Sequence, residues 1–243
     1  MLDNVKSKYI VKEIFENIKY KRKLNIIKYN KRIQERLNIN KKDFEIYKII
    51  KEFNNKYNTN IEDIDIKELN ISNKYIENED LRDIFKINFK ELKILDLSYN
   101  NISDINILEK VNFKELKQIY LNKNNISDIK VLEKVNFKEL KILDLSYNKL
   151  SDINILEKVY FKELKQLYLR YNKISDIKVL EMVNFKELKQ LDLNSNNISD
   201  IKVLEKVKFE KLEILNLGGN KIDCAKNNLI ISKLKSFLRN LII

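Results

Sequence analysis

The chain has 243 residues, of which 44% are apolar and 35% are charged, so it can bury a sizeable core under a well-solvated surface. It has no histidine, no proline, no tryptophan, one cysteine and only two glycines, Gly218 and Gly219. The commonest general base, thiolate metal sites and glycine-rich phosphate loops are therefore excluded. We predict a protein that is not an enzyme, with no catalytic residues, no cofactor and no metal.

The formal net charge of +12 is concentrated near the start of the chain. Residues 1–60 hold 16 Lys or Arg against 7 Asp or Glu, whereas the other 183 residues are nearly balanced. Lys, Asn and Ile dominate throughout, which is typical of an AT-rich genome and explains much of the lysine excess. No nucleic-acid motif accompanies the charge. We expect no nucleic-acid or acidic-lipid partner, and this basic segment is the only candidate for one.

Residues 1–60 are predicted to form a helical N-terminal cap of three short helices, the third marked by Phe44, Ile49 and Phe53. The stretch YIVKEIFENIKYKRKLNIIKYNKRIQERL faintly resembles the F-box, the three-helix module that docks substrate receptors onto cullin ubiquitin ligases. Ile14–Phe15 and Leu24 carry the resemblance, but Lys8–Tyr9 stands where the F-box has Leu-Pro. Two interpretations stay open: a plain cap and a docking module.

Residues 61–222 form an internal repeat with a period of 24 residues. Each in-phase unit contains Leu-x-x-Leu/Ile-x-Leu-x-x-Asn-x-Ile/Leu, as in Leu92, Leu95, Leu97, Asn100 and Ile102. Six copies are in phase after a degenerate first copy, which gives about seven turns. The phenylalanine that opens each in-phase unit recurs as Phe89, Phe113, Phe137, Phe161, Phe185 and Phe209.

This pattern is that of the leucine-rich repeat family. The I-S-D-I-x-x-L-E-K-V half of each unit resembles the repeats of the type-one phosphatase regulatory subunit and of bacterial internalins. The resemblance implies an α/β solenoid with short parallel strands on its concave face and short helices on its convex face.

The residues of one repeat support this geometry independently. The three leucines alternate with outward positions, as in a short strand. A stacked Asn column can bond successive backbone turns inside the solenoid. Ile102, Ile105 and Leu108 have helical spacing, and Ser103 is predicted to be the N-cap of that helix. The nearby Asp column, from Asp104 onward, could suggest calcium, but its place in the first helical turn explains it without a metal.

Residues 223–243 are predicted to be a C-terminal capping helix. Ile230, Leu234, Phe237, Leu238 and Leu241 would lie on one helical face and cover the apolar end of the array. The segment lacks the Pro-containing cap motif of the phosphatase regulators, which counts against that particular partnership.

The outward residues of the strands form the candidate binding surface, because tyrosine and arginine are enriched at protein interfaces. Asp96 and Asp144 would lie about 10 Å apart, too far to share a metal. The predicted partner-binding residues are Asp96, Tyr99, Tyr120, Lys123, Asp144, Tyr147, Tyr168, Arg170, Tyr171 and Asp192.

The sequence thus predicts a non-enzymatic module that binds a protein partner through its concave face. The alternative is an F-box-like substrate adaptor of a cullin ligase, and a third interpretation is a phosphatase regulatory subunit. The single cysteine, Cys224, and a start without a signal-peptide core favour a cytoplasmic protein without a transmembrane segment. We expect it to be a monomer.

Overall fold

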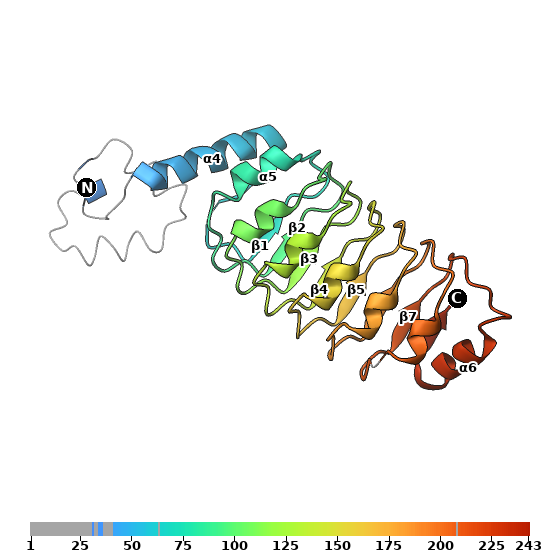
Figure 1. Cartoon of the computed structure of the whole chain (residues 1–243). Helices are drawn as coiled ribbons and strands as arrows, with labels where there is room; N and C mark the ends of the chain where they lie inside the picture. The colour runs from blue at the N-terminus through green and yellow to red at the C-terminus, as the bar shows by residue number, and fades with distance from the viewer. Residues whose placement is uncertain (1–30, 32–33, 36–40, 63, 208) are drawn as a thin grey trace.

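The computed structural model describes residues 31, 34–35, 41–62, 64–207 and 209–243. Its centre is one sheet of eight parallel strands that lie in chain order, from β1 to β8. The strands run along one side of an elongated array and the helical pieces along the other (Figure 1). The strands are β1 (Glu68–Asn70), β2 (Ile94–Asp96), β3 (Gln118–Tyr120), β4 (Ile142–Asp144), β5 (Gln166–Tyr168), β6 (Gln190–Asp192), β7 (Ile214–Asn216) and β8 (Asn240–Ile242).

The register of the sheet follows the sequence period. From β2 to β7 each strand residue pairs with the residue 24 positions further on, as Leu95 pairs with Ile119. The middle residue of each strand from β1 to β7 is buried and its two neighbours face outward, because side chains alternate along a strand. Equivalent residues of successive repeats therefore form straight rows across the outer face of the sheet, which we call the strand face.

The core is a stack of equivalent apolar residues. Leucines at the three core positions of each repeat are buried, and Phe89, Phe113, Phe137, Phe161 and Phe185 are each at most 2% exposed. Each turn buries its apolar side chains against the turns before and after it, so no single repeat could form this core alone.

The side of the array opposite the strands is built from short 3₁₀ helices. They are η2 (Asn106–Lys110), η3 (Lys130–Glu133), η4 (Asn154–Glu157), η5 (Lys178–Glu181) and η6 (Lys202–Glu205). The prediction that Ser103 caps the first of them is wrong: its N-cap residue is Ile105 and has no side-chain cap. Instead, Oδ1 of Asp104 accepts the N–H of Asn106 at 2.8 Å, because a side chain of this length reaches the N–H two residues ahead.

The same bond recurs at Asp128, Asp152, Asp176 and Asp200, so these aspartates hold the start of each helical piece. In the described part of the chain, no group of three or more His, Cys, Asp or Glu residues is arranged to hold a metal. Within the same ranges, no helix combines the length and the apolar content needed to cross a bilayer.

A buried asparagine in each turn joins neighbouring turns. Asn148, which is 8% exposed, donates from Nδ2 to the carbonyl of Leu121 at 2.9 Å and to that of Leu145 at 3.1 Å. Its Oδ1 accepts the N–H of Ile126 in the preceding turn at 2.9 Å. The predicted asparagine ladder is confirmed by these contacts, and Asn100, Asn124, Asn172, Asn196 and Asn220 make equivalent ones.

Two helices lie at the N-terminal end of the described array, α4 (Lys41–Tyr57) and α5 (Asn78–Ile84). The third predicted cap helix corresponds to α4, whose Ile50 and Phe53 are buried in the common core. Lys56 of α4 bonds Asp80 of α5 at 2.7 Å. The first two predicted cap helices, and the F-box resemblance with them, fall mostly outside the described residues.

The prediction of a capping helix over 223–243 is only partly right. Helix α6 (Asn228–Phe237) buries Ile230, Ile231 and Leu234, but Phe237 is 56% exposed. The chain then leaves the helix and forms β8, which pairs in parallel with β7. The reason is that β7 would otherwise present a row of unpaired backbone groups, which a strand satisfies and a helix does not.

We predict that Asn148→Leu strongly destabilises the protein. The substitution strands the Ile126 N–H inside the core, at about 1–3 kcal/mol. It also removes one of the two amide donors from each of the Leu121 and Leu145 carbonyls, which keep Asn124 and Asn172. Thermal or denaturant unfolding measures the loss, with the exposed Asn101→Leu as control. An unchanged melting temperature for Asn148→Leu would contradict the ladder.

Removal of β8 gives a second prediction. The Leu217 N–H donates to the Ile242 carbonyl at 2.7 Å, so deleting residues 239–243 exposes that amide to water. Its hydrogen exchange should accelerate by at least about tenfold, because exchange follows local opening. The mid-array Leu145 amide, which bonds the Tyr168 carbonyl, is the internal control and should keep its protection. Equal protection of Leu217 with and without β8 would contradict the strand's role.

Candidate functional site

The strand face carries two rows of side chains that include nearly all the predicted binding residues. The first, here called the floor row, runs along the last residue of each strand: Asp96, Tyr120, Asp144, Tyr168 and Asp192. The second, here called the rim row, lies three residues further along each repeat: Tyr99, Lys123, Tyr147 and Tyr171. Arg170 lies beside the rim row, so the fold brings all ten predicted residues to one side of the array.

The floor row alternates carboxylates and phenols. Asp96 pairs in register with Tyr120, which pairs with Asp144, and the alternation continues through Tyr168 to Asp192. Adjacent parallel strands lie about 4.8 Å apart, so successive carboxylates are about 10 Å apart with a tyrosine between them. The carboxylates are too widely spaced to bind one ion together.

The floor-row tyrosines are held against the sheet by glutamines. The Tyr120 hydroxyl donates to Oε1 of Gln118 at 2.9 Å, and the Tyr168 hydroxyl donates to Oε1 of Gln190 at 3.2 Å. Burial, with the neighbouring Asp96 and Asp144, raises the pKa of the Tyr120 phenol. Both phenols are therefore neutral, and their rings lie half-buried with fixed hydroxyls.

Each floor-row carboxylate uses one oxygen to hold the chain that follows its strand. Oδ1 of Asp96 accepts the Ser98 N–H, Oδ1 of Asp144 the Ser146 N–H, and Oδ1 of Asp192 the Asn194 N–H, at 2.9–3.0 Å. Asp192 is only 8% exposed. Burial raises the pKa of its carboxyl, against the opposing effects of the Asn194 N–H and the Arg170 charge.

The rim row is a continuous stack of rings and cations. The Lys123 ammonium lies 4.4 Å from the centroid of the Tyr99 ring and 5.1 Å from that of Tyr147. The Tyr147 and Tyr171 rings stack with centroids 4.3 Å apart and planes 10° apart. The Arg170 guanidinium lies 5.3 Å from the Tyr147 centroid. These contacts prearrange five neighbouring side chains along the edge of the strand face.

The rim row also has a strained backbone. Its four residues have φ between 53° and 56°, the left-handed region that favours glycine. The next two repeats place Ser195 and Gly219 there, so a small residue satisfies the same turn. A bulky side chain in this conformation costs about 1 kcal/mol or more. The fold therefore does not require aromatic side chains in this row.

Sequence reasoning missed two features of this surface. The glutamine partners of the tyrosines were not predicted: Gln118–Tyr120 and Gln166–Tyr168 have the same spacing, but Tyr168 bonds Gln190 of the next repeat. The left-handed backbone of the rim row was also missed. Its signals in the sequence are Asn73 and Gly219, which occupy the same place in the first and last repeats and are residue types that adopt this conformation readily.

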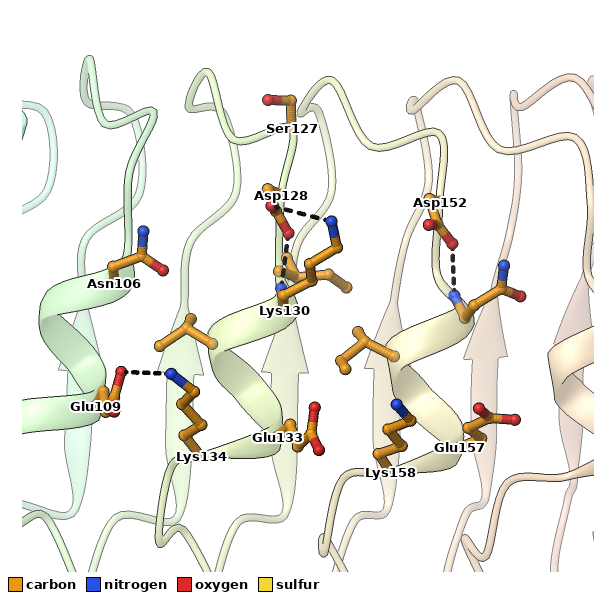
Figure 2. Close-up of a pocket in the computed structure, with 14 residues that line it drawn as sticks. Asn106, Glu109, Ser127, Asp128, Lys130, Glu133, Lys134, Asp152, Glu157 and Lys158 are labelled. Carbon is orange, nitrogen blue, oxygen red and sulfur yellow. Dashed lines mark hydrogen bonds and ion pairs between the residues drawn. The ribbon is translucent and has the colours of Figure 1, made fainter.

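A recess among the described residues lies on the opposite side, along η2, η3 and η4, with a volume of about 570 Å³. Figure 2 shows its polar side chains: Lys134 pairs with Glu109 of the preceding repeat, and Asp128 and Asp152 each accept a backbone N–H within their own repeat. The Lys134–Glu109 distance is 3.2 Å. A second recess, along η5 and η6, has the same composition. Both follow from the repeat spacing, and their charges are largely neutralised.

A stack of 24-residue turns with a strand on one side and a 3₁₀ helix on the other defines a parallel-strand solenoid, a fold whose long exposed face suits it to binding. The family model for leucine-rich repeats (two copies) matches residues 90–134, 114–158, 138–182 and 162–206. The chain is a leucine-rich repeat protein. That family is generally a non-enzymatic interaction fold.

Two solved structures are similar to this chain at low sequence identity. The plant peptide hormone receptor RGFR1, in complex with RGF2, matches with 20% identity and a TM-score of 0.47, over 64% of this chain. This chain spans only 28% of that receptor chain. Internalin C2 from Listeria monocytogenes matches with 19% identity and a TM-score of 0.43, over 69% of this chain and 92% of its own. No curated protein matches the sequence.

We predict that Asp192→Asn raises the melting temperature at pH 7. Because its pKa is raised in the folded protein, the Asp192 carboxyl binds a proton more readily there than in the unfolded chain. Its ionisation therefore lowers the free energy of unfolding as the pH rises through the native pKa. The amide oxygen can still accept the Asn194 N–H. The gain should shrink as the pH falls and the wild-type carboxyl becomes protonated.

Melting curves between pH 3 and pH 7 measure this effect. The matched control is Asp152→Asn, because Asp152 makes the same bond to an N–H two residues ahead but is exposed on the opposite side. A lower melting temperature for Asp192→Asn than for wild type at pH 7 would contradict the assignment.

Proposed function

We propose that this protein is a non-enzymatic binding module that holds a protein partner on its strand face. The floor row and the rim row offer a contiguous surface of phenol rings, carboxylates and cations on a rigid sheet. Tyrosine and arginine contribute most to protein interfaces because each buries a large area and keeps a polar contact.

The rim-row stack is the observation that carries this proposal. Tyr99 and Tyr171 are each nearly half exposed, although their backbone conformation favours glycine. Strain kept at an exposed position is a mark of a functional surface. The stack also reduces the rotamer freedom that binding would otherwise remove, so a partner meets a preorganised surface.

The centre of the proposed interface is Tyr120, Tyr147, Tyr168 and Tyr171 with Arg170. The other predicted residues, Asp96, Tyr99, Lys123, Asp144 and Asp192, surround it. A cytoplasmic location, which rests on the single cysteine, and a monomeric state remain part of the proposal.

The alternative is the F-box-like adaptor, in which residues 1–50 recruit a ligase and the strand face selects the substrate. It rests on Ile14–Phe15 and Leu24 in the sequence. A pull-down with the cullin adaptor protein separates the two functions, because only the adaptor function requires capture. The phosphatase-regulator interpretation has no support beyond the likeness of single repeats.

The test begins with affinity purification of a partner from the native cell. Tyr168→Ala and Arg170→Ala should each weaken its binding by about 2 kcal/mol, or roughly thirtyfold, if they are interface anchors. Tyr168→Ala also loses a hydrogen bond, worth about 1 kcal/mol of stability, which leaves the array folded. Melting temperature is measured beside affinity to confirm this.

The control is Lys178→Ala, an exposed change on the opposite side of the array that should alter affinity little. If both strand-face variants bind the partner as tightly as wild type does, the interface lies elsewhere. The basic N-terminal segment then becomes the first candidate, and a steep salt dependence would be its mark.

A further inference from the structure

The floor row is an acidic surface on a basic protein. The chain carries a net charge of +12, yet Asp96, Asp144 and Asp192 lie along the middle of the strand face. Lys123 and Arg170 lie over the rings of the rim row. The floor row itself carries a charge opposite in sign to that of the whole molecule.

The carboxylates of the floor row have a free side. In each of them only Oδ1 accepts hydrogen bonds from described residues, and those bonds come from the two-residue turn that follows the strand. None of the three forms an ion pair with a described Lys or Arg within 4.0 Å, the limit for such a pair. The second oxygen of each is left for another donor.

At Asp192 the absence of an ion pair is energetically unfavourable. Its residue is more than nine-tenths buried, and a carboxylate removed from water without an ion pair is destabilising. The Arg170 charge offsets only part of this cost. The raised pKa of its carboxyl expresses the same cost. The sheet alone does not need a carboxylate here, because Asn216 holds the equivalent N–H, that of Gly218, in the next repeat.

The tyrosines between the carboxylates complete a site for a cation. A phenol ring flanked by carboxylates attracts an ammonium or guanidinium through its face and through charge-assisted hydrogen bonds. The rim row already shows this chemistry within the protein, where Lys123 lies between the rings of Tyr99 and Tyr147. The floor row has the rings and the carboxylates but not the cation.

The spacing of the row restricts what can fill it. Carboxylates two strands apart are about 10 Å apart along the array. A polyproline-type segment advances about 9.3 Å in three residues and then presents the same side again. Basic side chains at every third position of such a segment would match the carboxylates one for one.

We infer that the floor row binds a basic, extended segment of a protein partner, with one Lys or Arg side chain at each of Asp96, Asp144 and Asp192. This inference rests on the proposed function and names the chemistry of the partner. The acidic floor repels phosphate, so a nucleic acid or an anionic membrane is an unsuitable occupant of this face.

The test uses the full chain and three synthetic proline-rich peptides. One has arginine at every third position, one has the same number of arginines at every second position, and one has glutamate in place of arginine. Binding is followed by the ring NMR signals of the floor-row tyrosines. The first peptide should bind at least about tenfold more tightly than the glutamate peptide, and also more tightly than the second peptide. Its affinity should fall at high salt.

Asp144→Asn and Asp192→Asn should each weaken binding of the first peptide by about fivefold or more. Asp152→Asn is the matched control: it makes the same turn bond on the opposite side of the array and should leave affinity unchanged. Melting curves show that each variant is folded. Equal binding of the glutamate peptide, or full affinity in both floor-row variants, would overturn the inference, as would no binding at millimolar peptide.

The outcomes separate this inference from the proposed function. If the floor-row Asp→Asn variants keep full affinity for the arginine peptide but Tyr168→Ala still weakens binding of the native partner, the proposed function stands and this inference fails. The strand face would then bind a partner without using its carboxylates to recognise basic side chains. If neither set of changes has an effect, both proposals fail.

Discussion

The asparagine ladder is the constraint on which the other features of the array depend. Strands of three residues make few backbone bonds, so the strands alone do not fix how one turn sits on the next. Each buried Asn adds bonds to carbonyls in its own and the preceding turn and accepts an N–H from that preceding turn. Since an unpaired group at that depth costs about 1–3 kcal/mol, the ladder enforces a constant 24-residue turn.

Because every turn has the same length, equivalent residues of successive repeats form rows across the sheet. Because strands pair with a 24-residue offset, a residue's neighbour on the strand face is its equivalent in the next repeat. Units 88–111 and 136–159 are almost identical, and so are units 112–135 and 160–183. The true period is thus 48 residues, which is why acid and ring alternate along the floor row.

The two sides of the array differ in how their charges and strain are balanced. On the 3₁₀-helix side, aspartates hold helix starts and Lys–Glu pairs bridge turns, so little is left for a ligand. On the strand face, aromatic side chains occupy a left-handed backbone and Asp192 is buried without an ion pair. The fold does not require these unfavourable features, and they are gathered on one face. A binding role for that face would explain them.

The sequence by itself determined the repeat phase, the strands and the buried Leu, Phe and Asn columns. It also determined the side on which the ten candidate residues lie. Each of these features follows from the 24-residue period, which is visible in every in-phase repeat. Their binding role remains a prediction. The tertiary structure decided what depends on neighbours: the ring stack of Tyr147 and Tyr171, the glutamine partners of the tyrosines, and the end of the array. Leu241 fits a helical face as well as a strand, and only the open edge of β7 selects the strand, because backbone groups there need partners.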